Sequence, residues 1–238
     1  MLPEYLGPHS VGVVDFETTK TSLLLRLYYP STKQPSDTRA KWLPDSLMYM
    51  RGYVSFMNLP TIVAYLLSPF LGRYRKPAFA NSQIISGETP LPIFIFSHGL
   101  CGMRTTYSSF LGSLASIGFL VVAIEHSDKS GCITTRLGAE IPYEHPNGVK
   151  TCIGSPSGFL EWTQGQIMSG LLQWRQGQIV HRIDEIQNTV KFLADLNNGE
   201  ISLDQLYGNL KIDPLMFKGR LDLENLVLGG HSFGVNYF

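Results

Sequence analysis

The sequence predicts an α/β fold in which a mostly parallel sheet is flanked by helices. Residues 92–96 (PIFIF) and 119–124 (FLVVAI) are short, continuous apolar runs, as expected of strands buried in a parallel sheet. Residues 105–117 between them carry apolar side chains at helical spacing, and Gly118 follows as a helix stop. A strand, a helix and a second strand in this order form a right-handed crossover unit with parallel strands.

The N-terminal part predicts two further strands separated by a polar turn. Residues 11–16 and 22–29 have the apolar and β-branched composition of strands, and Thr-Thr-Lys-Thr lies between them. Residues 30–44 are polar and predict a surface loop, and residues 81–90 predict a loop that leads to the next strand.

An apolar helix is predicted over residues 59–71. Its large side chains fall on one helical face, and a proline lies near each end. From its residues alone, this helix either packs on the core or lies on a lipid surface. Three basic residues that follow it, Arg73, Arg75 and Lys76, keep the lipid-surface interpretation open.

The C-terminal half predicts a long loop, a helix and a last strand. Residues from Glu125 to about Arg175 are rich in glycine, serine and proline and indicate an irregular excursion, which in a compact domain is usually functional or mobile. Apolar side chains between residues 179 and 196 then predict an amphipathic helix, which ends at residues 197–199 (NNG). A polar linker leads to the strand-like run 226–228 (LVL).

The pattern Gly230-x-Ser232-x-Gly234 directly follows this last strand. A strand followed by G-x-S-x-G is the nucleophile elbow of an α/β-hydrolase, which holds its serine in a strained turn between strand and helix. Glycines on either side allow the backbone to turn that tightly. The α/β-hydrolase fold supplies its acid and its histidine after the serine, and no Asp, Glu or His follows Ser232. We therefore expect one partial α/β-hydrolase domain over residues 1–238, comprising the N-terminal part of the fold without its C-terminal strands.

Ser232 is the candidate nucleophile, and two backbone amides are candidates for an oxyanion hole. A serine hydroxyl needs a base to become an effective nucleophile, and the tetrahedral intermediate needs N–H donors placed beforehand. The first donor is the N–H of Phe233, the residue after the nucleophile. The second is assigned to the N–H of Leu100, in the His-Gly turn that directly follows the strand at 92–96.

Three further candidates are interpreted as structural. His98 lies in the turn after the strand and is expected to brace it rather than to act as a base. His231 lies within the elbow, where its side chain is expected to point away from Ser232. The cluster at 125–128 (EHSD) precedes the serine, which is the wrong chain order for the acid and base of this fold, so it is expected to support the site from outside.

Composition excludes several classes of function. The 238 residues carry a formal net charge of zero, which argues against a nucleic-acid-binding protein. Three cysteines at irregular spacing predict neither a disulfide framework nor a zinc site, so we expect no metal and no cofactor. We expect a cytoplasmic protein, because the first residues lack the pattern of a signal peptide and no run of 18 apolar residues occurs. Peripheral membrane contact through residues 59–71 stays open as an addition to this expectation.

Several motifs occur in a fixed order along the chain: Phe96-Ser97-His98-Gly99-Leu100, Arg104-Thr105-x-Tyr107-Ser108, Leu114-Ala115-Ser116-x-Gly118-Phe119, Glu125-His126-x-Asp128-x-Ser130 and Gly230-His231-Ser232-Phe233-Gly234. In these motifs the chain resembles the platelet-activating factor acetylhydrolase family, in its plasma and intracellular types. The opening segments 7–12 (GPHSVG) and 25–30 (LRLYYP) are similar as well, and the resemblance extends to residue 234.

The resemblance implies an α/β-hydrolase with calcium-independent phospholipase A2 activity, a serine esterase that cleaves short or oxidised sn-2 acyl groups of phospholipids. Ser232 would be the nucleophile, and the N–H groups of Leu100 and Phe233 the oxyanion hole. The interface-binding helix of that family falls near residues 59–71, which favours the lipid-contacting interpretation of this segment.

The sequence departs from that family at three points. Val235 stands where the family has a second glycine, the triad Asp and His are absent, and so are the remaining elements of the sheet. This pattern is typical of a fragment, a truncated gene model or a splice form, and it predicts an unpaired apolar edge on the strand at 224–229 together with very low activity. Two alternatives to a lipid esterase stay open: a non-catalytic isoform, and another carboxylesterase or thioesterase.

Overall fold

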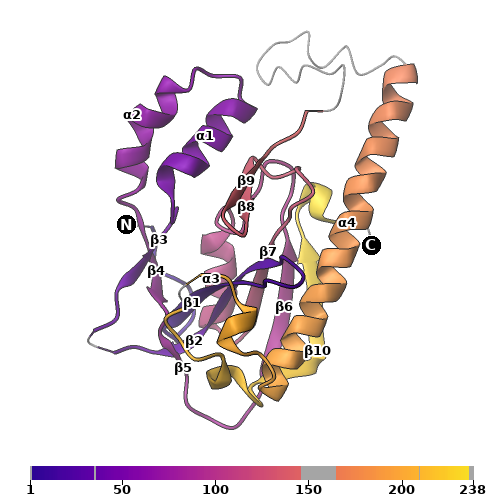
Figure 1. Ribbon diagram of the computed structural model, residues 1–238. Coiled ribbons are helices and arrows are strands. Elements are labelled where there is room, and N and C mark those ends of the chain that lie inside the picture. Colours follow the sequence, from indigo (N-terminus) through magenta and orange to yellow (C-terminus); the bar gives the residue numbers. More distant parts are fainter. Residues whose placement is uncertain (1, 35, 146–164, 209, 236–238) are drawn as a thin grey trace.

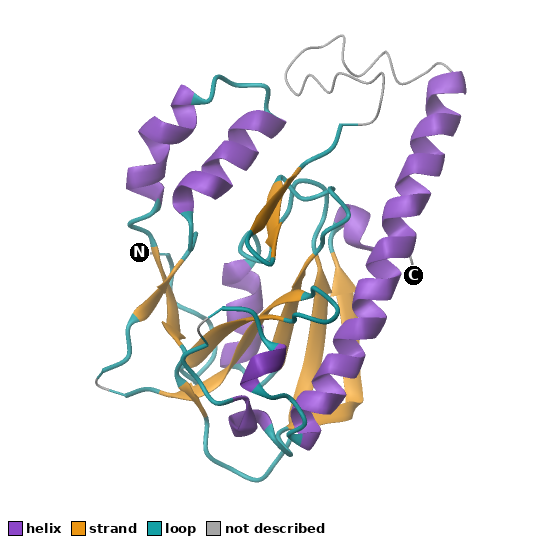
Figure 2. Ribbon diagram, viewed as in Figure 1, coloured by secondary structure: helices purple, strands orange, loops and turns teal. Residues whose placement is uncertain are grey.

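A mixed β-sheet with helices on both faces forms the body of the molecule (Figures 1 and 2). The computed structural model describes residues 2–34, 36–145, 165–208 and 210–235. The strands are β1 (Val11–Glu17), β2 (Leu24–Thr32), β3 (Arg39–Lys41), β4 (Arg75–Ala80), β5 (Gln83–Ile84), β6 (Leu91–Ser97), β7 (Leu120–Glu125), β8 (Ile133–Arg136), β9 (Ala139–Pro142) and β10 (Leu221–Gly230). The helices are α1 (Ser46–Phe56), α2 (Ile62–Leu71), α3 (Ser108–Ser116) and α4 (Gly165–Asn198), with short 3-10 turns η2 (Leu203–Gln205), η3 (Pro214–Phe217) and η4 (Ser232–Val235).

The sheet has the strand order β10-β6-β7-β2-β1-β4-β3, and β5 pairs with β2. Strands β10, β6 and β7 are parallel, and α3 connects β6 to β7, so the predicted crossover unit and the α/β fold class are confirmed. The other half of the sheet is mixed, because β2 runs antiparallel to both β1 and β7 while β1 and β4 are parallel. The sheet is therefore mixed, with its parallel half around β6.

The register of β10 against β6 determines where the site lies. Gly230 pairs with Ser97, so the last residues of both strands lie at the same edge of the sheet. Parallel strands share a carboxyl end, and the loops that follow them therefore meet. The turn after β6 and the elbow after β10 consequently start from adjacent positions. Strand β10 is also the edge strand of the described sheet, as expected of the strand at 224–229.

The helices cover opposite faces of the sheet because strand side chains alternate between the two faces. In β7, the side chains of Leu120, Val122 and Ile124 pack with those of α4, whereas Val121 and Ala123 pack with α3. All five are buried, and each fully buried Leu, Val or Ile side chain stabilises the fold by about 1.5–3 kcal/mol. This two-sided burial explains why the β7 segment is continuously apolar.

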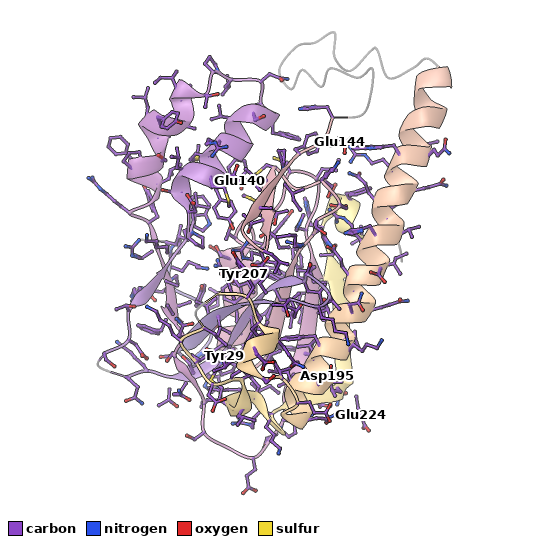
Figure 3. The ribbon with its side chains drawn as sticks, in the orientation of Figure 1. Tyr29, Glu140, Glu144, Asp195, Tyr207 and Glu224 are labelled. Carbon is purple, nitrogen blue, oxygen red and sulfur yellow. The ribbon has the colours of Figure 1, made fainter. Side chains whose placement is uncertain are left out.

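Helices α1 and α2 form a hairpin at one end of the molecule, beside the β8–β9 hairpin (Figure 1). Asp45 caps α1, because its carboxylate accepts a hydrogen bond from the Met48 N–H at 3.0 Å. Glu140 of β9, labelled in Figure 3, reaches toward α1, where Arg51 Nη2 lies 2.9 Å from its carboxylate. The apolar helix predicted at 59–71 corresponds to α2. Helix α1 was not predicted, because its sequence shows no clear apolar face.

The segment from Glu125 to Arg175 is more ordered than expected. It contains the β8–β9 hairpin, and α4 begins at Gly165, well before the predicted start of the helix. Within the predicted irregular stretch, residues 146–164 lie outside the described residues. The hairpin was missed because strands of four residues are too short to show an alternating pattern.

Two predicted loops contain short strands. Strand β3 lies within residues 30–44 and β5 within residues 81–90, while β4 was not predicted. Backbone pairing to longer neighbours, rather than side-chain pattern, forms such short strands. Lys76 of β4 does not flank the apolar helix as a free cation: it is fully buried, and its Nζ donates to the Tyr28 hydroxyl at 3.2 Å. Burial and the nearby Arg26 hold the pKa of Lys76 well below its ordinary value.

Within the described ranges, no helix is both long and apolar enough to cross a bilayer.

We predict that Phe217→Ala destabilises the fold by about 3–5 kcal/mol, the range for removing a fully buried phenyl ring. Phe217 is fully buried in η3, and its ring meets those of Tyr29 and Phe16 edge-on, with centroids 5.2 and 6.0 Å away. Leu215→Ala in the same turn is the matched control, because its side chain is 51% exposed. Urea unfolding of both variants measures the difference, and equal losses would contradict this account of the core.

Candidate active site

Ser232 lies in a sharp turn between β10 and η4. Its φ is +54°, in the left-handed region that residues with side chains rarely occupy, and its side chain is exposed. A Cβ at Gly230 would clash with the carbonyl of Gly234, and one at Gly234 would clash with the carbonyl of Ser97. The two glycines of the motif are therefore required by close backbone packing, and the strained geometry is that of a nucleophile elbow.

The turn after β6, which we call the His98 turn (residues 98–102), lies against this elbow. A Cβ built on Gly99 would be 3.3 Å from the Cβ of Ser232 and 3.0 Å from the carbonyl oxygen of His231. The N–H of His231 donates to the carbonyl of Ser97 at 3.2 Å, which joins the start of the elbow to the start of the turn. The structure thus brings the predicted serine and the predicted oxyanion loop together.

The amides of Leu100 and Phe233 are both available. Neither N–H has a hydrogen-bond acceptor within the described part of the chain, whereas the neighbouring Cys101 N–H donates to Ser130 at 2.8 Å and Gly234 N–H donates to His231 at 2.9 Å. One of these donors follows the exposed serine in the chain and the other lies in the turn against it, so the two could together bind a developing oxyanion.

Tyr107 links the His98 turn to the elbow on one side. Its hydroxyl accepts from the Gly99 N–H at 3.3 Å and lies 2.9 Å from Nδ1 of His231. Burial raises the pKa of Tyr107, so the phenol keeps its proton and can donate it to the imidazole. The His231 ring is therefore engaged by Tyr107, in keeping with the structural role expected of it.

His98 braces its own turn. The ring is almost fully buried: Nδ1 lies 2.9 Å from the Gly99 carbonyl, and Nε2 accepts the His126 N–H at 3.2 Å. Burial and the nearby Arg182 hold the pKa of His98 well below its usual value, so the ring stays neutral. A buried ring with both nitrogens bound to backbone has no path to a substrate, which fits the expected bracing role.

A buried network of hydrogen bonds joins Ser97, His126 and Glu185 in the order serine, histidine, acid of a catalytic triad. Unlike a catalytic triad, it is not accessible to a substrate. Ser97 Oγ lies 2.7 Å from Nε2 of His126, and His126 Nδ1 lies 2.6 Å from the carboxylate of Glu185 on α4. Ser97 and His126 are fully buried and Glu185 nearly so. A nucleophile must reach its substrate. This hydrogen-bonded network is buried, so it supports the His98 turn and does not carry out the reaction.

The protonation states of His126 and Glu185 in this network follow from their burial and their hydrogen-bond partners. Burial and Arg182 lower the pKa of His126, so the imidazole is neutral, with Nδ1–H donating to Glu185 and Nε2 accepting from Ser97. Burial alone would raise the pKa of Glu185, but hydrogen bonds from His126 and His181 outweigh it and hold that pKa well below its usual range. The neighbouring Asp128 is buried and paired with Arg182, so the 125–128 cluster is structural, as expected.

Arg182 was not foreseen as part of the site. It lies on the buried face of α4 and is fully buried, and it contacts both the His98 turn and the ring of Phe233. Its signal in the sequence is indirect: Arg182, Glu185 and Thr189 place polar groups on the same helical face as Ile186 and Leu193. A run of polar residues on the buried face of an amphipathic helix indicates a buried network rather than a core contact.

To act as a nucleophile, Ser232 requires a general base that accepts its proton. Within the described residues, no imidazole or carboxylate is hydrogen-bonded to the Ser232 hydroxyl, and no group of three His, Cys, Asp or Glu side chains is arranged to hold a metal ion. Cys101 and Cys132 are free thiols, and Cys152 lies outside the described residues.

We predict that the two buried neutral histidines make the fold lose stability in mild acid. The unfolded chain binds protons below about pH 6.5, whereas folded His98 and His126, with lowered pKa values, do not. The free energy of unfolding therefore falls, as pH decreases below 6.5, by up to about 1.4 kcal/mol per pH unit for each histidine.

Urea unfolding between pH 7.5 and 5 tests this, because His126→Asn should make the slope shallower. His181→Asn is the control with the opposite sign: hydrogen bonding to Glu185 raises the pKa of His181, so its loss should make the slope steeper. Identical slopes in both variants and the wild type would be incompatible with buried neutral rings.

Comparisons with known proteins identify the family to which the chain is similar. The family model described as platelet-activating factor acetylhydrolase, isoform II, matches residues 1–236. The platelet-activating factor acetylhydrolase of Cavia porcellus is 32% identical over 236 residues, covering 98% of this chain and 50% of that protein. The corresponding enzyme of Canis lupus familiaris is 33% identical over 239 residues, with the same coverage.

Among solved structures, a ferulic acid esterase from Streptomyces cinnamoneus is similar, with a TM-score of 0.47 and 18% identity, covering 98% of this chain and 54% of that one. The chain spans about half the length of the curated relatives it matches. The match of the family model over nearly the whole chain, together with the elbow and the His98 turn, shows that the chain belongs to the platelet-activating factor acetylhydrolase, isoform II, family.

Proposed function

We propose that this protein is a serine esterase that hydrolyses short or oxidised sn-2 acyl groups of phospholipids, with 1-alkyl-2-acetylglycerophosphocholine as the reference substrate. The observation that carries the proposal is the exposed Ser232 at φ +54°, held directly against the His98 turn. Membership of the acetylhydrolase family supports the substrate class.

In the proposed reaction, Ser232 Oγ attacks the carbonyl carbon of the sn-2 ester and its proton passes to a general base. The carbonyl oxygen becomes an oxyanion, which the N–H groups of Leu100 and Phe233 stabilise. The lysophospholipid leaves with a proton, and water then hydrolyses the acyl-serine to a short carboxylic acid. No step calls for a metal or a cofactor, which makes calcium independence part of the proposal.

Helix α2 supports a lipid surface as the place of action. Ile62, Leu66 and Phe70, spaced four residues apart, are exposed by 59, 62 and 63%. The inward face is small: Ala64 and Ser68 are buried, and Ala64 packs with Met50 and Val54 of α1. A helix that packs through its small residues and exposes its large apolar ones is suited to insertion into a membrane surface.

We also propose that the protein works in a reducing, cytoplasmic compartment, bound peripherally to membranes. The thiols of Cys101 and Cys132 remain unpaired, as expected of cysteines outside an oxidising compartment.

We predict that Ser232→Ala abolishes the hydrolysis of 1-alkyl-2-acetylglycerophosphocholine that the wild type shows, because the attacking hydroxyl is gone. Ser109→Ala, an exposed serine on α3, is the matched control and should keep full activity. A calcium chelator should have no effect. Release of acetate from the labelled substrate, compared with release of a long sn-2 chain, is the measurement.

The alternatives give different results in the same experiment. Activity that survives in Ser232→Ala would refute Ser232 as the nucleophile. Faster Ser232-dependent cleavage of thioesters or simple carboxylic esters would favour another esterase. Failure of a fluorophosphonate probe to label the wild-type chain would favour a non-catalytic protein.

For α2, we predict that Leu66→Asp weakens binding to phosphatidylcholine vesicles by at least about tenfold, because inserting one leucine contributes about 1.5–3 kcal/mol. Val180→Asp on α4 is the matched control, since Val180 is equally exposed but far from α2 in sequence and on a different helix. Sedimentation with vesicles measures both, and equal losses would speak against α2 as the lipid-contacting surface.

A further inference from the structure

We propose that Arg182 is a positioning residue for the oxyanion hole, which holds the His98 turn and the elbow in register with one another. The inference rests on the proposed function, because the role of the hole is part of that proposal. Arg182 lies on α4, fifty residues before the serine, and is fully buried. Its guanidinium contacts both segments that supply the candidate donors.

The contact with the His98 turn is a hydrogen bond to backbone. Nη1 donates to the carbonyl oxygen of His98 at 2.6 Å and lies 3.3 Å from Oγ of Ser97. The peptide unit that begins with the His98 carbonyl leads directly into Gly99 and then to the Leu100 N–H. A charge-assisted hydrogen bond to that carbonyl therefore restricts the orientation of the peptide next to the Leu100 N–H.

The contact with the elbow is through the Phe233 ring. The guanidinium carbon of Arg182 is 4.7 Å from the ring centroid, within the range of a cation–π interaction. Phe233 is itself buried, with its side chain inside the fold while its N–H is free. Holding this ring fixes the residue that supplies the Phe233 N–H.

The guanidinium is in turn held by the segment after β7. Nε donates to the Asp128 carboxylate at 2.7 Å, and Nη2 donates to Ser130 Oγ at 2.5 Å. The Ser130 hydroxyl also donates to Asp128 at 2.5 Å. The side chains of both Arg182 and Asp128 are fully buried. All three nitrogens of the planar guanidinium, Nε, Nη1 and Nη2, thus donate hydrogen bonds. A lysine has a single ammonium group and cannot reproduce this arrangement.

This arrangement differs from an ordinary buried ion pair in what it connects. An ion pair that only stabilises the fold would join α4 to the loop after β7 and end there. Arg182 extends from that anchor to both walls of the proposed oxyanion hole. Because the hole acts on the transition state and not on the bound ester, misalignment should lower kcat and leave KM unchanged.

The test compares Arg182→Lys with Lys191→Gln, a change at an exposed residue two and a half turns further along α4. Hydrogen exchange reports positioning independently of activity. The Cys101 and Gly234 N–H groups are hydrogen-bonded neighbours of Leu100 and Phe233. In Arg182→Lys both amides should exchange at least about tenfold faster, and Lys191→Gln should match the wild type.

The kinetic part uses the 2-acetyl phospholipid and its thionoester analogue, in which sulfur replaces the carbonyl oxygen and accepts hydrogen bonds poorly. Arg182→Lys should lower kcat about a hundredfold with KM unchanged, as expected when the oxyanion donors are misplaced. The preference of the wild type for the oxygen ester should shrink in the variant, a change that a purely stabilising role would not produce.

Should Arg182→Lys not fold, Ser130→Ala takes its place, because it removes the hydroxyl that accepts from Nη2 and keeps the backbone carbonyl of residue 130, which accepts from the Cys101 N–H. The same changes should appear, with kcat reduced about tenfold, the equivalent of one hydrogen bond. A lower melting temperature with unchanged exchange at Cys101 and Gly234 would overturn the inference. If the wild type shows no Ser232-dependent hydrolysis, the proposed function fails, and the exchange data still decide whether Arg182 holds the two segments.

Discussion

The parallel pairing of β10 with β6 is the constraint on which the site depends. With Gly230 opposite Ser97, the strands end together, and the two turns that follow are forced into contact. A slip of one residue would turn every side chain of β10 to the other face of the sheet and remove Ser232 from Gly99. The close approach at Gly230 and Gly234 leaves no room for side chains, and the approach at Gly99 is tight, so the register and the glycines of the motif are required together.

Around this contact the protein places polar groups where most folds place apolar ones. Ser97, His126, Glu185 and Arg182 are buried under the His98 turn, and each has a specific partner. Such a network is costly to bury unless it is satisfied, but it fixes one geometry more sharply than apolar contacts do. Two members of this network, Arg182 and Glu185, lie on α4. This helix packs through Ile186 and Leu193 against the apolar core on one face of the sheet.

Much of this architecture could be predicted from the sequence, and the parts that could not have physical causes. The elbow and the crossover unit were predictable because glycine spacing and long apolar runs are local signals. Strands β3, β5, β8 and β9 were not, because two to four residues show no period and form through pairing with partners distant in sequence. The position of Ser232 against Gly99 was expected from the order of the motifs. Arg182 and Glu185 were not identified, because their only signal is their place on the apolar face of the helix, and that signal does not name the groups they bind until the helix is packed.

The most direct test of the account is a crystal structure of the protein after reaction with an organophosphonate, which mimics the tetrahedral intermediate. The account predicts phosphorus bonded to Ser232 Oγ, with the phosphoryl oxygen within about 3 Å of the backbone nitrogens of both Leu100 and Phe233. Attachment at another residue, or a phosphoryl oxygen turned away from the His98 turn, would contradict it.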